Sequence, residues 1–323
     1  MATHRIFYID ALKAFAIVLV VMGHLSPYIW ETGDSHSLYL PILSAFHMPL
    51  FMAMSGYVTN VEKFQLEKKA KMLIPFFVFG LAWVAYNHYS FLAFFEHEAK
   101  GGYWFLYVLF MFYLFMTGIR ASKRNLYVGM VFVQVFLMGL HFCLHRTVPG
   151  TTLSTDHMFQ LWPFFCMGIV MRKGLQEKLL QHKLLSTAVC SLVIACVIFG
   201  GGKLMHLTGT LEIYSNDLMS FFIVPLLFLI FHEAEYRMKA NHNKLKAVTK
   251  YLVNELGVNT LQIYVLQYFA LSFFIKYLYE TMNWNLTSYE WIASPIISII
   301  LSYLCVLVSQ AMHKMKLGFV FGR

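Results

Sequence analysis

The chain consists of long apolar runs separated by short polar segments. Ten of these runs approach the length of about 20 residues that an α-helix needs to cross a hydrocarbon layer. The pattern predicts an all-α, polytopic transmembrane helical bundle of about ten spans, forming one membrane-embedded domain over residues 1–323. A short surface helix is expected within the polar segment 233–256. The predicted spans lie near residues 12–30, 38–59, 73–95, 103–118, 126–144, 158–171, 184–200, 214–232, 257–279 and 291–312.

Composition supports a membrane location. Hydrophobic residues occupy 59% of the 323 positions and charged residues 13%, whereas soluble domains carry roughly 25% charged residues. The segment from Ala2 to Tyr8 is short and polar, and no small-residue cleavage site follows the first apolar run. We therefore expect that run to be the first span and not a cleaved signal peptide.

The distribution of basic residues predicts the orientation. When the polar segments are assigned to alternate sides, the side of the N-terminus holds 20 Lys and Arg residues, and the other side holds only Lys100, Arg146 and Lys203. The positive-inside rule then predicts that both termini are cytoplasmic. We expect the membrane to be a bacterial cytoplasmic membrane. This asymmetry accounts for the net charge of +9 without a nucleic-acid partner.

Two further patterns carry little functional weight. Neither disulfides nor a zinc site is expected from the five cysteines, because they lie in apolar runs without CxxC spacing. They are Cys143, Cys166, Cys190, Cys196 and Cys305. His141 and His145 have an i,i+4 spacing that can bind metal on one helix face, but no third ligand is near them in the sequence. No metal is expected.

Ionisable residues inside the apolar runs are the candidates for chemistry, because such groups are costly in a membrane. Lys13 lies near the cytoplasmic end of the first run and can extend its amine to the headgroups. His24 follows eleven residues later, about 16 Å along a helix axis, in the outer half of the membrane. His47 in the second run lies at a comparable depth, so the two imidazoles are predicted to share a cavity.

These residues also carry a family resemblance. Lys13 and His24 match the basic-x10-His signature of the membrane acyltransferase 3 family, whose members O-acylate sugars and other hydroxylated acceptors. Lysine stands where the family often has arginine, and Gln267 stands where relatives often carry histidine. Five further segments are similar to family motifs in the same order: Phe46 to Tyr57, Lys68 to Pro75, Trp104 to Leu106, Trp162 to Gly168 and Gly257 to Tyr264.

The resemblance implies transfer of an acyl group from a thioester to a hydroxyl. The donor is expected to be cytoplasmic acetyl-CoA, and the acceptor a glycan or a lipid-linked sugar. A neutral hydroxyl is a poor nucleophile, and histidine has a pKa suited to removing its proton. His24 is therefore predicted to be the base or an acyl carrier, with His47 or Ser55 orienting it or stabilising the oxyanion. Donor- or substrate-binding residues are expected to be Asp10, Lys13, Lys68, Lys69, Lys71, Trp104 and Gln267.

Two other functions stay open at this point. A transporter or flippase could move a sugar or an acyl donor, although the sequence lacks the mid-membrane acidic relay of a proton-coupled transporter. A catalytically silent binding relative would keep the fold without the reaction. Lys68, Lys69 and Lys71 fit the phosphates of CoA, but plain positive-inside bias accounts for them equally well.

Overall fold

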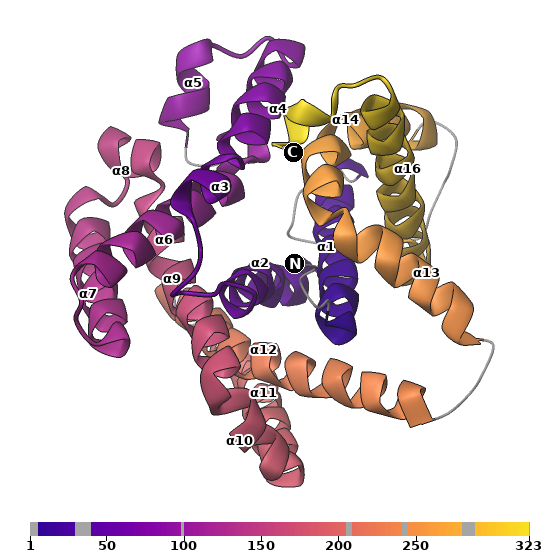
Figure 1. Ribbon diagram of the computed structural model, residues 1–323. Coiled ribbons are helices and arrows are strands. Elements are labelled where there is room, and N and C mark those ends of the chain that lie inside the picture. The colour runs from indigo at the N-terminus through magenta and orange to yellow at the C-terminus, as the bar shows by residue number, and fades with distance from the viewer. Residues whose placement is uncertain are drawn as a thin grey trace. The chain divides into compact units, whose positions relative to one another are not determined.

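The computed structural model consists of helices and describes residues 6–29, 40–97, 100–204, 209–240, 245–279 and 288–322 (Figure 1). Within these ranges no strand occurs. The all-α prediction is therefore confirmed for this part of the chain.

Every predicted span contains a helix, but fewer helices meet the criteria for crossing a membrane. Among the described residues, 6 helices are long and apolar enough, and a seventh is possible if a pair bent by 100° counts as one span. The count of ten spans stays a prediction. The six are Phe7–Leu25, Leu66–Tyr86, Trp104–Ala121, Leu126–Leu144, Leu218–Lys239 and Tyr289–Lys314.

The chain divides into two compact units, with a boundary inside the second long helix. Unit 1 comprises residues 1–54 and 170–307, and unit 2 comprises residues 55–169 and 308–323. The elements that begin in unit 1 or lie mostly within it are α1 (Phe7–Ile29), α2 (Leu40–Tyr57), η3 (Met171–Leu175), α10 (Gln176–Gln181), α11 (Lys183–Leu204), α12 (Gly209–Ala240), α13 (Leu245–Val258), α14 (Thr260–Tyr279), η4 (Tyr289–Ala293) and α16 (Ser294–Lys314). Those of unit 2 are α3 (Leu66–Ala70), α4 (Leu73–Tyr86), α5 (Phe91–Glu96), η2 (Lys100–Gly102), α6 (Trp104–Ala121), α7 (Leu126–Leu144), α8 (Val148–Leu153), α9 (Thr155–Val170) and η5 (Gly318–Phe321).

Unit 1 is built around α1, which packs against α12, α13 and α14. Gly257 of α13 allows a close approach to α1, because a Cβ at this position would overlap the backbone carbonyl of Asp10. The surface helix predicted within residues 233–256 is thus replaced by the end of α12 and by α13, a helix packed on α1.

Unit 2 has an aromatic core between α6 and α9. Phe112, Trp162 and Phe165 are buried, and the Trp162 indole N–H donates to the Met130 carbonyl at 3.0 Å. Gly56 lies directly against α9, since a Cβ there would overlap the Phe165 carbonyl. The Trp162-to-Gly168 segment singled out in the sequence therefore contributes to packing.

One predicted span is too long. The sequence predicts a single helix over residues 73–95, whereas α4 ends at Tyr86 and α5 begins at Phe91. The helix stops because the polar residues after Tyr86 turn the backbone: the Asn87 side chain donates back to the Trp83 carbonyl at 2.9 Å, and His88 adopts a φ of 57°.

Candidate active site

His24 lies near the end of α1, beside the middle of α14. Its Nε2 is 3.2 Å from the Tyr268 hydroxyl, and the two rings lie 4.9 Å apart. Sequence analysis had not singled out Tyr268. The only signal for it was its place next to Gln267, in the segment that follows the Gly257-to-Tyr264 motif.

Two buried polar atoms lie at this place. They are Nδ1 of His24 and Oε1 of Gln267. The other end of the Gln267 amide donates to the Tyr264 carbonyl at 3.2 Å, which fixes the side chain. The Gln267 side chain also hydrogen-bonds with the His24 ring, so the imidazole lies between the Tyr268 hydroxyl and the Gln267 amide.

His47 is held by its own helix. Its Nδ1 lies 2.5 Å from the Leu43 carbonyl, and since a carbonyl oxygen only accepts, Nδ1 must carry the proton. In the neutral ring this leaves the Nε2 lone pair available. His47 lies close enough to interact electrostatically with His24. The predicted cavity shared by the two imidazoles stays a prediction.

Asp10 and Lys13 form an ion pair at the start of α1, with 3.4 Å between the carboxylate and the amine. The pair is an i,i+3 contact on one helix face. The lysine of the signature is therefore neutralised in part by its own helix, and the predicted donor-binding role of both residues stays a prediction.

The remaining predicted residues belong to unit 2. The Ser55 carbonyl accepts from the Thr59 hydroxyl at 2.6 Å. Lys68 and Lys71 are exposed. Lys69 differs from them, because its amine lies 3.2 Å from the Tyr113 hydroxyl and 4.5 Å from the centre of that ring.

Trp104 stacks on His157 at the start of α9, with ring centres 4.0 Å apart and an interplanar angle of 20°. An indole stacked on an imidazole is a rigid surface against which a planar or apolar group can pack. His157 was missed in the sequence because it lies within a mixed polar segment and matches no motif.

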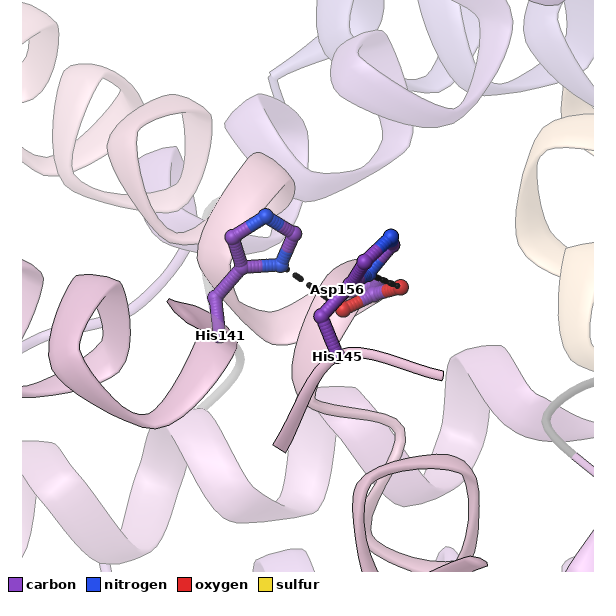
Figure 2. A group of neighbouring side chains, drawn as sticks. All are labelled: His141, His145 and Asp156. Atoms are coloured by element: carbon purple, nitrogen blue, oxygen red, sulfur yellow. Dashed lines mark hydrogen bonds and ion pairs between the residues drawn. The ribbon is translucent and has the colours of Figure 1, made fainter. Parts of the chain in front are cut away.

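A carboxylate lies beside His141 and His145, which their sequence neighbours do not reveal. The Asp156 carboxylate lies 2.7 Å from Nδ1 of His141 and 2.8 Å from Nδ1 of His145 (Figure 2). The sequence concealed this residue because Asp156 belongs to the following long helix, α9, and only the fold of the connection brings it back to α7.

A cavity of about 760 Å³ opens between α6 and α7. It is almost wholly apolar, with Ser122 and Arg124 at one end. None of the predicted catalytic or donor-binding residues lines it, so the cavity is not part of the candidate active site.

The profile of the family described as "Acyltransferase domain" (acyltransferase 3) matches residues 6–308. The chain belongs to this family. The match contains α1 with Lys13 and His24, α2 with His47, and α14 with Gln267.

Two curated relatives are similar to part of the chain. The nodulation protein NolL of Sinorhizobium fredii is 29% identical over 221 residues, which is 61% of this chain and 58% of the relative. The nodulation protein NolL of Mesorhizobium japonicum is 24% identical over 230 residues, which is 64% of this chain and 60% of the relative. The similarity thus spans less than two thirds of either relative's length. No solved structure matches the chain.

Proposed function

We propose that the protein is a membrane O-acyltransferase that moves an acetyl group from acetyl-CoA to a hydroxyl of a glycan or a lipid-linked sugar. The observation that carries this proposal is the buried His24 imidazole, positioned by the Tyr268 hydroxyl and the Gln267 amide. Membership of the acyltransferase family, with the profile covering residues 6–308, supports the reaction class. Acetyl as the acyl group and a carbohydrate as the acceptor rest on the motif resemblance.

The proposed reaction uses His24 as a general base. With the Nε2 proton donated to Tyr268, Nδ1 holds a lone pair that can take the acceptor's hydroxyl proton. The hydroxyl oxygen attacks the thioester carbonyl carbon, the C–O bond forms as the C–S bond breaks, and the CoA thiolate leaves and is protonated. His47 and Ser55 are proposed to orient the base or to stabilise the oxyanion.

The reaction itself is tested with purified full-length protein, labelled acetyl-CoA and a panel of hydroxylated glycans and lipid-linked sugars. Acceptor-dependent appearance of labelled ester is the expected result. Transport of label into sealed vesicles without ester formation would favour the transporter, and binding without either would favour a silent relative.

We propose that Lys68, Lys69 and Lys71 bind the phosphates of the donor. Alanine at all three positions should weaken acetyl-CoA binding more than it slows turnover, and raised salt should weaken wild-type binding in the same way, because exposed charges are screened. The measurement is donor affinity and kcat of the triple variant at two ionic strengths. Alanine at Lys123, Lys173 and Lys178, three other exposed lysines, is the matched control. If the test variant and the control variant bind acetyl-CoA equally well, these three lysines serve only to orient the protein in the membrane.

We propose ten spans with both termini in the cytoplasm of a bacterial inner membrane. Single cysteines placed in a cysteine-free chain at Lys123 and Lys178 should then resist an impermeant thiol reagent in intact cells. Cysteines at His88, which follows the end of α4, and at Thr147, which follows α7, should react, because this orientation places both connections outside. Labelling of the first pair from outside would refute this orientation.

A further inference from the structure

We propose that His141, His145 and Asp156 form a binding site for a divalent transition-metal ion of the Zn²⁺ class. One nitrogen of each imidazole and one carboxylate oxygen lie within 4.8 Å of one another. Atoms bonded to one ion through bonds of about 2.0–2.2 Å lie at most about 4.4 Å apart, so small side-chain rotations suffice to close the set. Two imidazoles and a carboxylate are ligands that such ions accept, with a fourth position left for water.

The histidine pair is presented by one helix end. His141 lies in the last turn of α7, and His145 caps it, with its backbone N–H donating to the His141 carbonyl at 2.8 Å. Residues four apart share a helix face, whereas Cys143 between them points elsewhere and is not part of the group. The set therefore consists of nitrogen and oxygen atoms without a thiolate.

The third ligand comes from the first turn of the next long helix. Asp156 uses one oxygen for each histidine, and Figure 2 marks both contacts with dashed lines. In this arrangement each Nδ1 carries a proton and donates to the carboxylate. A neutral imidazole can move that proton to Nε2, which frees the Nδ1 lone pair for an ion.

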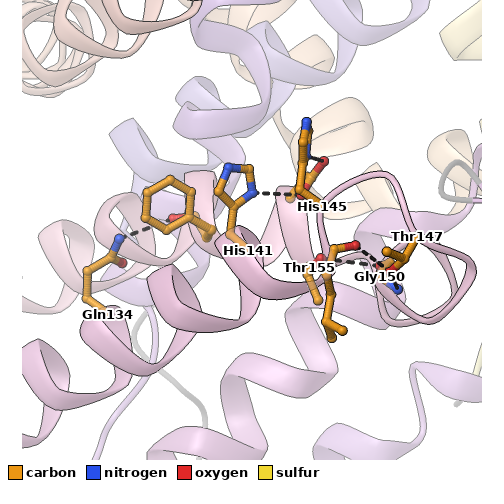
Figure 3. A network of polar contacts seen from close by, with 9 residues as sticks. Gln134, His141, His145, Thr147, Gly150 and Thr155 are labelled. Carbon is orange, nitrogen blue, oxygen red and sulfur yellow. Dashed lines mark hydrogen bonds and ion pairs between the residues drawn. The ribbon is translucent and has the colours of Figure 1, made fainter.

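Neighbouring contacts hold the ligands in place. The His141 ring stacks on Phe159 with centres 4.8 Å apart, and the Phe159 carbonyl accepts from the Gln134 amide at 3.4 Å (Figure 3). The side chains of His141 and Asp156 are 19% and 22% exposed, and that of His145 is 42% exposed. The group is thus ordered on one side and open to ions from solvent on the other.

The connection between the two helices is tightly folded and includes α8. Thr147 caps α8 by accepting from the Gly150 N–H at 3.2 Å, and the Thr155 hydroxyl donates to the Gly150 carbonyl at 3.4 Å. Arg146 and Ser154, at the two ends of the connection, adopt positive φ values of 59° and 54°, which are unfavourable for residues with a side chain. An ion held by α7 and α9 would close this connection and stabilise it.

The test uses full-length protein in detergent, purified without a polyhistidine tag and treated with chelator, and the probes are Co²⁺ and Zn²⁺ alone. Wild-type protein should bind one Co²⁺ with a visible d–d spectrum, lose the spectrum to one equivalent of Zn²⁺, and gain thermal stability. His145→Gln and Asp156→Asn should each weaken binding at least about tenfold, because loss of even an outer-shell partner costs about 10- to 100-fold.

Two controls keep the result specific. His182→Gln changes an exposed histidine elsewhere, and Cys143→Ser removes the neighbouring thiol. Both should bind like wild type. Absence of a saturable site in the wild type, or loss of binding in Cys143→Ser with normal binding in His145→Gln, would overturn the proposal. Absence of Co²⁺ binding by the wild-type protein would refute the proposal even if a variant failed to fold.

Discussion

Replacing His24 with alanine should abolish acetyl transfer while leaving the protein folded and inserted. Removal of a general base typically costs about 100- to 10,000-fold in rate. The effect on folding should be smaller than the effect on the rate, because the ring contributes two polar contacts, one with Tyr268 and one with Gln267. The measurement is kcat for labelled ester formation, alongside the melting temperature in detergent.

Further variants distinguish loss of the base itself from loss of the groups that contact it. His24→Asn keeps a hydrogen-bonding side chain but cannot accept the proton, so it should be nearly as inactive as alanine. Tyr268→Phe removes only the hydroxyl on Nε2 and should lower kcat less than His24→Ala does. His232→Ala is the matched control, since His232 is another imidazole of unit 1 but packs edge-on against Tyr8. Near wild-type transfer by a correctly folded His24→Ala protein would remove this residue from the mechanism.

Replacing Gly257 with alanine should strongly reduce stability, although alanine is the better helix former. The added Cβ would meet the backbone carbonyl of Asp10, and backbone cannot move aside as a flexible side chain can. Overpacking of this kind costs about 1–3 kcal/mol. Because the clash pushes on the start of α1, activity should fall together with the melting temperature.

Gly139→Ala provides the comparison, because Gly139 also lies within a helix but has no neighbour within 4 Å of an added Cβ. There the higher helix propensity of alanine, worth about 1 kcal/mol, should leave stability unchanged or raised. Gly56→Ala should behave like Gly257→Ala, since its Cβ would overlap the Phe165 carbonyl. Equal melting temperatures for the Gly257 and Gly139 variants would contradict the packing argument.

The sequence by itself determined the fold class and the family. Runs of apolar residues indicate burial in lipid or among helices, and this information is local to each run. α7 therefore begins and ends at its predicted bounds, whereas α1 begins before its predicted start and α11 ends after its predicted end. The spacing of Lys13 and His24 was likewise readable, because a signature lies along one helix. Breaks set by backbone turns were less visible: the predicted span over 73–95 stops at Tyr86, where Asn87 and His88 turn the chain.

Only the tertiary structure decided which side chains meet. Tyr268 contacts His24 across 244 residues of sequence, and Asp156 reaches His141 across 15. Neither pairing leaves a trace in hydrophobic periodicity, because that pattern specifies which face of a helix is buried and not what packs against it. The same holds for Gly257, whose sequence neighbours gave no sign that its missing side chain makes room for the backbone of α1.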